Sequence, residues 1–175
     1  HDIVAVGRVE PQKNHRMLLQ GYQLFDRKYP EHRLVLYGKG FLQEGLETFA
    51  KELGIKQKVV FAGFTQEVEK QIQNAAMYVL SSDYEGISNS LMEAMALGLP
   101  VISTDCPIGG SKMLISDKRN GMLTPVGDME AFAAAMCYVA EDAERAEEMG
   151  RKAEYVRQAY SVEVICQKWI AELKR

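Results

Sequence analysis

The chain has 175 residues, of which 47% are hydrophobic and 26% are charged, and its formal net charge is -3. These values are ordinary for a soluble globular protein with one core. A negative chain has no general attraction to nucleic acid or to anionic lipid, so we expect no nucleic-acid partner. No apolar run approaches the length of a membrane span, and no signal-peptide pattern opens the chain.

The chain has three cysteines, widely spaced and without a C-x-x-C pair, which argues against a disulfide framework and a zinc site. A reducing, cytoplasmic setting is the simplest interpretation. The first residue is His1 rather than Met, and strand-like sequence begins two residues later. We therefore expect this chain to be a piece of a longer protein.

Short apolar runs alternate with longer helical patterns along the chain. We expect strands over residues 3–6, 33–37, 58–61, 76–80, 101–104 and 121–124. We expect helices over residues 14–28, 43–53, 66–74, 91–97, 129–140, 143–159 and 162–173. This alternation predicts a Rossmann-like, doubly wound α/β domain, with a parallel sheet of about six strands and helices on both faces. We see no second domain boundary, so residues 1–175 should form a single domain.

In doubly wound sheets, ligands bind at the carboxyl ends of the strands. We therefore expect the ligand-binding loops to lie among residues 7–13, 38–41, 62–65, 81–90 and 105–111.

The segment from Glu85 to Pro100 carries the strongest functional signal. Its helix is apolar nearly all round, which predicts burial, and Glu93 is its one charge. A buried carboxylate needs partners. One alternative is a capping box, in which Glu93 reaches back to the backbone N–H of Ser90. The other is that Glu93 accepts hydrogen bonds from the hydroxyls of a bound sugar ring, such as a ribose.

Two neighbouring features point to an anion. Gly86 allows the backbone to approach a ligand closely, and the N–H groups of residues 87–91 point out of a helix start, which is a ready site for phosphate. Arg8 and Lys13 lie in the loop after the first strand, which should open onto the same edge, and two cations there suit a diphosphate. The alternatives are that Glu85 is a solvated loop residue and that Arg8 and Lys13 are solvated surface cations.

Other residues carry weaker signals. His15 and His32 have no Ser or Cys motif near them, so we expect both to be solvated surface residues. Trp169 stands at helical spacing from Ile165 and Leu173, which favours a packing role.

Together these residues resemble the C-terminal domain of the group 1 glycosyltransferases, the large retaining family numbered four in the usual classification. The resemblance spans nearly the whole chain. It is carried by Glu85-x7-Glu93 followed by Ala94, Gly98 and Pro100-Val101, by Gly7-Arg8 with Lys13-Asn14, and by the stretch from Asn120 to Asp128. It implies a two-domain GT-B fold with this chain as the donor-binding half.

The resemblance also implies roles for individual residues. Arg8 and Lys13 would hold the donor diphosphate, Glu85 would face the transferred sugar, and Glu93 would hold the ribose. The nucleobase would lie near Gly63 and Phe64. The full set of donor-binding residues would be Gly7, Gly63, Phe64, Gly86, Ile87, Ser88, Asn89, Ser90, Leu91 and Glu93, with Arg8, Lys13 and Glu85 as the catalytic residues.

The implied activity is retaining transfer of a hexosyl group from a UDP- or GDP-sugar to a sugar or lipid-linked acceptor, without a cofactor or a bound metal. The missing N-terminal acceptor domain would be a partner, toward which the last helix, about 161–173, would pack. The chain alone should be inactive, and peripheral membrane association would belong to the full-length protein.

Three alternatives remain open: a sugar-nucleotide epimerase of this architecture, a phosphorylase, and a binding module without chemistry. In one respect the sequence departs from the family. Many relatives carry a Glu after the glycine pair that matches Gly109-Gly110, whereas Ser111-Lys112 occupies that stretch here.

Overall fold

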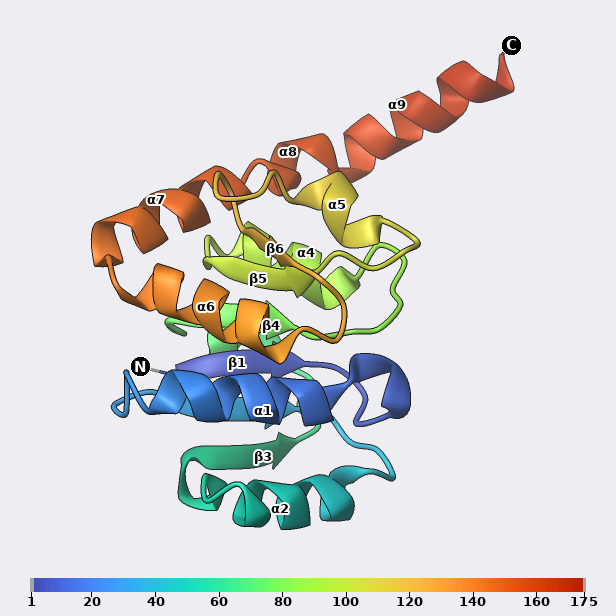
Figure 1. The fold of residues 1–175 in the computed structure, drawn as a ribbon. Coiled ribbons are helices and arrows are strands. Elements are labelled where there is room, and N and C mark those ends of the chain that lie inside the picture. The colour runs from blue at the N-terminus through green and yellow to red at the C-terminus, as the bar shows by residue number, and fades with distance from the viewer. Residues whose placement is uncertain (1, 175) are drawn as a thin grey trace.

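The computed structural model describes residues 2–174, which form one six-stranded sheet with helices on both sides (Figure 1). The strands are β1 (Asp2–Val6), β2 (Arg33–Tyr37), β3 (Val59–Gly63), β4 (Met77–Leu80), β5 (Val101–Thr104) and β6 (Met122–Thr124). Their order is β3-β2-β1-β4-β5-β6, and every neighbouring pair is parallel. The prediction of a doubly wound, Rossmann-like α/β domain is confirmed.

The strands are apolar on both faces because each face is covered by helices. In β1, Ile3 packs into one buried layer and Val4 into the layer on the opposite face. The same alternation separates Met77 from Tyr78 in β4. Strands that are buried on both faces carry continuous apolar runs, which explains why these short segments could be recognised from the sequence.

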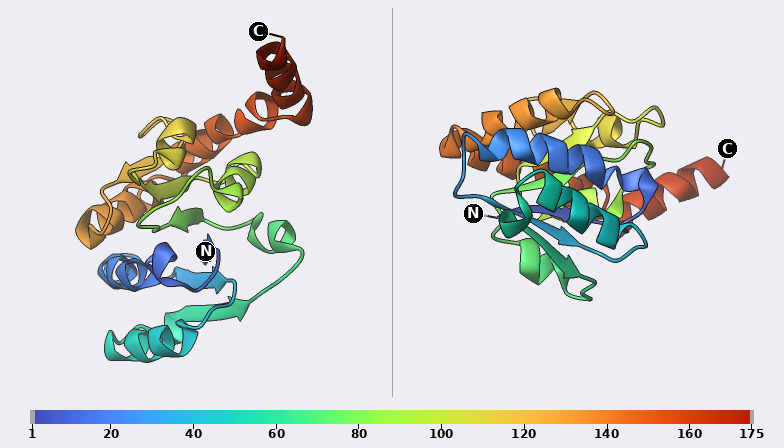
Figure 2. Two further views of the ribbon diagram at one scale, coloured as in Figure 1. Left: turned by 90° about the vertical axis from the view of Figure 1, so that its right-hand side faces the viewer. Right: turned by 60° about the horizontal axis from the view of Figure 1, so that its bottom comes forward.

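The helices form a layer on each face of the sheet (Figures 1 and 2). The α-helices are α1 (His15–Asp26), α2 (Gln43–Glu52), α3 (Val68–Ile72), α4 (Asn89–Ala96), α5 (Gly110–Leu114), α6 (Met129–Ala140), α7 (Ala143–Ala153), α8 (Val156–Ala159) and α9 (Val162–Leu173). Two 3-10 helices, η1 (Pro11–Lys13) and η2 (Lys56–Lys58), precede α1 and β3. The apolar side chains of α1, α2 and α6 share one core layer, and those of α3, α4, α5 and α8 share the other.

Two predicted elements were wrong. The single helix expected over 143–159 is interrupted at Glu154 and Tyr155, which separates α7 from α8. The loop expected over 105–111 contains the start of α5, which follows Gly109 in the left-handed region at φ 80°. A helix of five residues is too short to leave a periodic apolar pattern, so only the glycine pair was visible in the sequence.

The histidine prediction was also wrong, because His15 is 6% exposed and His32 is 8% exposed. His32 packs edge-on against Phe25, with 5.4 Å between the ring centroids. Aromatic packing of this kind has no local signature, since Phe25 lies on a helix and His32 in the loop that follows.

The last helix, α9, extends away from the body of the domain (Figures 1 and 2), and none of its residues is buried. Trp169 is 67% exposed, so the packing role expected for it is not present within the described residues. Among residues 2–174, no helix is both long and apolar enough to cross a membrane.

Candidate functional site

The site lies at the carboxyl ends of β1 and β4, where the order in which the chain adds strands to the sheet reverses. The chain runs from β1 outward to β2 and β3, then returns to β4 beside β1 and continues to β5 and β6 on the other side. The loops after β1 and β4 therefore diverge from neighbouring strands, and such a switch point is where open α/β sheets bind ligands.

The two loops are joined by hydrogen bonds between residues far apart in sequence. The N–H of Asp83 donates to the carbonyl of Gln12 at 2.9 Å, and the Ser81 hydroxyl donates to the carbonyl of Lys13 at 2.7 Å. The Asn14 side-chain amide donates to the Asp83 carboxylate at 2.6 Å. This network fixes the first loop against the second before any ligand binds.

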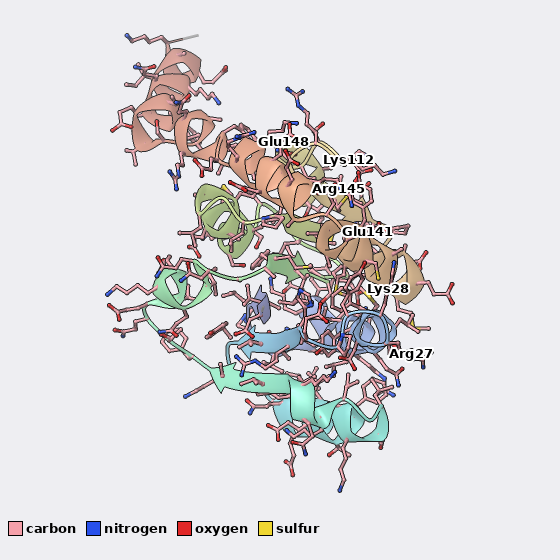
Figure 3. All side chains as sticks on the ribbon, turned by 90° about the vertical axis from the view of Figure 1, so that its left-hand side faces the viewer. Arg27, Lys28, Lys112, Glu141, Arg145 and Glu148 are labelled. Atoms are coloured by element: carbon pink, nitrogen blue, oxygen red, sulfur yellow. The ribbon has the colours of Figure 1, made fainter. Side chains whose placement is uncertain are left out.

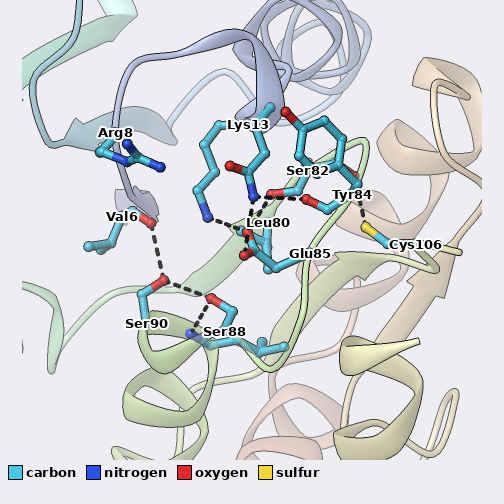
Figure 4. Close-up of polar contacts among 12 residues, drawn as sticks. Val6, Arg8, Lys13, Leu80, Ser82, Tyr84, Glu85, Ser88, Ser90 and Cys106 are labelled. Atoms are coloured by element: carbon cyan, nitrogen blue, oxygen red, sulfur yellow. Dashed lines mark hydrogen bonds and ion pairs between the residues drawn. The ribbon is translucent and has the colours of Figure 1, made fainter. Parts of the chain in front are cut away.

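Lys13 and Glu85 form an ion pair across the two loops (Figure 4). Both side chains are only 14% exposed. The Glu85 carboxylate also accepts a hydrogen bond from Ser82 Oγ at 3.2 Å and one from Gln12 Nε2 at 3.4 Å. The alternatives of a solvated Glu85 and a solvated Lys13 are therefore wrong. The two residues lie together, as expected for loops that open onto the same edge of the sheet.

The neighbouring residues Gly7 and Arg8 differ in how far they are constrained. A Cβ atom on Gly7 would lie 2.9 Å from Lys13 Cε, so the glycine leaves room for the lysine side chain. Arg8 lies in the same loop (Figure 4), but its side chain is 70% exposed and its Nη1 pairs with Glu10 Oε2 at 3.1 Å. Arg8 is thus at the expected edge and free to reorient.

The start of α4 differs from the expectation. Ser88, in extended conformation, is the N-cap, and its hydroxyl accepts a hydrogen bond from the N–H of Leu91 at 3.4 Å. Ser90 lies inside the helix, where its hydroxyl bonds to the carbonyl of Val6 at 3.2 Å. The capping box between Ser90 and Glu93 is therefore wrong, because the helix begins at Asn89 and its cap is Ser88.

Glu93 is half-buried rather than buried, because α4 presents one side to the core and another toward α3. Desolvation raises the pKa of the Glu93 carboxyl, and the charge of Glu69 raises it further. Within residues 2–174, no hydrogen bond or ion pair reaches this carboxylate. With the capping box removed, the half-buried Glu93 carboxylate is open to solvent or to a ligand.

The other predicted residues lie around the same edge. Ile87 is 44% exposed, whereas Leu91 has its side chain in the core and its N–H already bonded to Ser88. Gly63 ends β3, where its carbonyl accepts a hydrogen bond from the N–H of Gly38 at 2.8 Å. Phe64, which follows Gly63, is 67% exposed and available for stacking.

The glycine pair at the start of α5 packs against the loop that precedes α4. A Cβ atom on Gly110 would lie 1.9 Å from the carbonyl oxygen of Gly86. Only glycine permits that approach, so the start of α5 and the loop before α4 pack backbone against backbone. This contact gives Gly110 a structural role immediately before Ser111-Lys112, the stretch that departs from the family pattern.

His15 lies behind Lys13 at the start of α1. Burial lowers its pKa to about 4, with the charge of Lys13 as a second cause, so the imidazole is neutral at pH 7. Its Nδ1 is buried without a hydrogen-bond partner in the described part of the chain.

Sequence reasoning missed several residues that shape the site, namely Gln12, Asn14, Ser82 and Asp83. All are polar residues of the two loops, and nothing in their local pattern distinguishes them from solvated loop residues. Only the pairing of β1 with β4 brings them into contact.

The arrangement gathers two kinds of group at one edge. Arg8, Lys13 and the N-terminus of α4 provide positive charge and N–H donors, which suit a diphosphate. Glu85 and Glu93 provide acceptors for hydroxyl groups.

Comparison with known proteins agrees with this geometry. Residues 1–156 match the family model described as glycosyl transferases group 1. A glycosyltransferase of Haemophilus influenzae is 30% identical over 167 residues, which cover 95% of this chain and 47% of that protein. A Campylobacter jejuni protein, named as a 4-alpha-N-acetylgalactosaminyltransferase acting on a diphospho-undecaprenol acceptor, is 31% identical over 140 residues, covering 80% of this chain and 37% of its own.

Among solved structures, Staphylococcus aureus TarM in complex with UDP superposes with a TM-score of 0.91 and 26% identity. The match covers 97% of this chain and 34% of TarM. The chain thus spans less than half the length of each of these proteins. The family model matches residues 1–156, and the fold agrees with that match. The chain therefore belongs to the group 1 glycosyltransferases.

Proposed function

We propose that this chain is the donor-binding half of a retaining glycosyltransferase that transfers a hexosyl group from a UDP- or GDP-sugar to a sugar or lipid-linked acceptor. The observation that supports it best is the junction of the β1 and β4 loops. There Lys13 meets Glu85, beside the N-terminus of α4, and Glu93 lacks a protein partner within residues 2–174.

In the proposed reaction, the bond from the anomeric carbon to the diphosphate breaks, a bond to the acceptor oxygen forms with retained configuration, and the proton of the acceptor hydroxyl passes to the leaving diphosphate. Arg8 and Lys13 stabilise the negative charge that develops on the leaving diphosphate. Glu93 accepts hydrogen bonds from the ribose hydroxyls, and Glu85 faces the transferred sugar. The nucleobase lies against Gly63 and Phe64.

The proposed partners follow from the relatives and from α9. TarM binds UDP, and the Campylobacter protein is named for a lipid-linked diphosphate acceptor, which supports a nucleotide-sugar donor and that class of acceptor. An N-terminal acceptor domain would cover the exposed side chains of α9, including Trp169 and Leu173. We also propose a cytoplasmic location, with peripheral membrane association for the full-length protein.

We propose that no metal takes part, because Arg8, Lys13 and the helix N-terminus supply positive charge. Family membership favours transfer over the epimerase and phosphorylase alternatives. A binding module without chemistry would have no need to keep Lys13, Glu85 and Glu93 together at one edge.

Calorimetric titration of the chain with UDP, GDP, ADP and inorganic phosphate tests the proposal. We expect UDP or GDP to bind weakly but more tightly than phosphate, and we expect no turnover by this chain alone. Lys13→Met should weaken UDP far more than uridine. Absence of binding by every nucleotide would refute the donor site, and equal weakening of UDP and uridine would remove Lys13 from the phosphate.

A further inference from the structure

A cavity of about 470 Å³ lies between α5 and the end of α7 and shares no residue with the β1–β4 edge. Three of its lining side chains are cations, Lys112, Arg119 and Lys152, and none is a carboxylate. The chain as a whole has a net charge of -3, whereas every charged side chain that lines this cavity is a cation, although Lys112 and Lys152 are paired with carboxylates outside the lining. Such a local field attracts anions even where the global charge does not.

The cavity is framed by hydrogen bonds that do not involve the cations. Asn120 is 7% exposed, and its side chain donates to the carbonyl of Leu114 at 3.1 Å and accepts from the N–H of Ser116 at 2.7 Å. The hydroxyl of Tyr155 donates to the same Leu114 carbonyl at 2.9 Å. The break between α7 and α8 lies at Tyr155 and so positions the Tyr155 side chain as part of the cavity lining. The cavity should therefore keep its shape when a single cation is replaced.

The three cations differ in their partners. Lys112 Nζ pairs with Asp105 at 3.2 Å, and Lys152 Nζ pairs with Glu148 at 2.7 Å. Arg119 forms no ion pair and no side-chain hydrogen bond within residues 2–174. It follows Lys118, which holds a left-handed conformation at φ 60°, an unusual one for a residue with a side chain. Within residues 2–174, Arg119 is thus a guanidinium without a protein partner, in a cavity that Lys112 and Lys152 also line.

We propose that this cavity binds a phosphate group, carried by a lipid headgroup or by a small soluble phosphoester. The planar guanidinium of Arg119 offers paired N–H donors that match two phosphate oxygens, and Lys112 and Lys152 add charge on either side. Because all three side chains are solvent-exposed, binding is weak and falls as salt rises. This inference goes beyond the proposed function and does not depend on it.

Two probes distinguish the sources of the phosphate. Sedimentation with vesicles of phosphatidylcholine mixed with phosphatidylglycerol, against pure phosphatidylcholine, reports a headgroup. Backbone amide NMR with glycerol 3-phosphate reports a soluble phosphoester, and signals from residues 116–121 separate this cavity from the loop of Arg8 and Lys13. We expect Arg119→Ala to weaken binding about fivefold or more, and Arg119→Lys to weaken it less.

Two matched variants serve as controls. Arg27→Ala removes an exposed arginine at the end of α1, away from Lys112 (Figure 3), and Lys13→Met removes a donor-site cation. Both should retain binding at residues 116–121. Binding of either probe that depends on Arg119 supports the proposal and identifies the source. Binding of neither probe, or an equal loss in Arg27→Ala or Lys13→Met, overturns it.

Discussion

The ion pair between Lys13 and Glu85 should contribute measurably to the stability of the ligand-free chain. We consider Lys13→Met, which removes the charge but keeps an unbranched stem over Gly7. Loss of one partner of a fully buried pair costs about 3–5 kcal/mol. Here both side chains are 14% exposed, and Glu85 keeps hydrogen bonds from Ser82 and Gln12. We therefore expect a smaller cost, about 2 kcal/mol.

Urea unfolding at pH 7 measures this cost, and for a domain of this size it corresponds to a fall of about 4–8 °C in Tm. A double-mutant cycle with Glu85→Gln isolates the interaction. We expect the double variant to be more stable than the sum of the single costs predicts, by about 1 kcal/mol. Arg8→Met is the matched control, since that side chain is 70% exposed, and it should cost less than about 0.5 kcal/mol.

A cost of Lys13→Met no larger than that of Arg8→Met would refute a stabilising ion pair. An additive cycle would do the same, because the two charges would then not interact in solution.

Three further predictions concern the same site. Burial lowers the pKa of His15 from 6.5 to about 4, so the unfolded chain takes up a proton at a higher pH than the folded chain does. The free energy of unfolding should therefore drop by about 3 kcal/mol as the pH falls from 6.5 to about 4. His15→Gln should remove that part of the pH dependence in urea titrations, and parallel curves would contradict the assignment. Because the pKa of Glu93 is raised, its charge destabilises the folded chain above the ordinary carboxyl pKa, so Glu93→Gln should raise Tm at pH 7 while weakening UDP about tenfold. Glu69→Gln should also raise Tm but leave calorimetric UDP affinity unchanged, and an equal loss in both variants would deny Glu93 a ligand role. Gly110→Ala should lower the free energy of unfolding in urea by more than about 2 kcal/mol and should weaken UDP binding. Gly45→Ala, in open space on α2, should raise the free energy of unfolding by about 0.5–1 kcal/mol. Similar effects of the two substitutions would refute the backbone contact.

The fold could be predicted because its inner strands are buried on both faces and most of its helices have clear ends. Asp128, Asp142 and Ser161 cap α6, α7 and α9, and the side chain of each accepts a hydrogen bond from the N–H three residues later. Prediction failed where a helix was very short or where two serines could each supply the N-cap. The five residues of α5 are too few for a period, and α4 begins at Asn89 because Ser88, not Ser90, supplies the cap.

The site was only partly predictable, for a topological reason. Lys13 and Glu85 could be assigned to one edge because both follow strands. That they touch depends on β4 returning beside β1, and so do the bonds from Gln12 and Ser82. Contacts between loops that are 72 residues apart in sequence leave no trace in either loop's own composition.

Under the proposed function, the pairing of charges at this edge determines which part of a nucleotide-sugar donor provides affinity. Arg8 is paired with Glu10 and Lys13 with Glu85, so a bare phosphate must compete with a carboxylate for each cation. Glu93 is in the opposite situation, because its charge is disfavoured and hydroxyl donors would relieve that cost. Binding of the nucleoside part should therefore supply most of the affinity. The cations then gain most when the leaving diphosphate develops charge, which favours the transition state over the bound ground state.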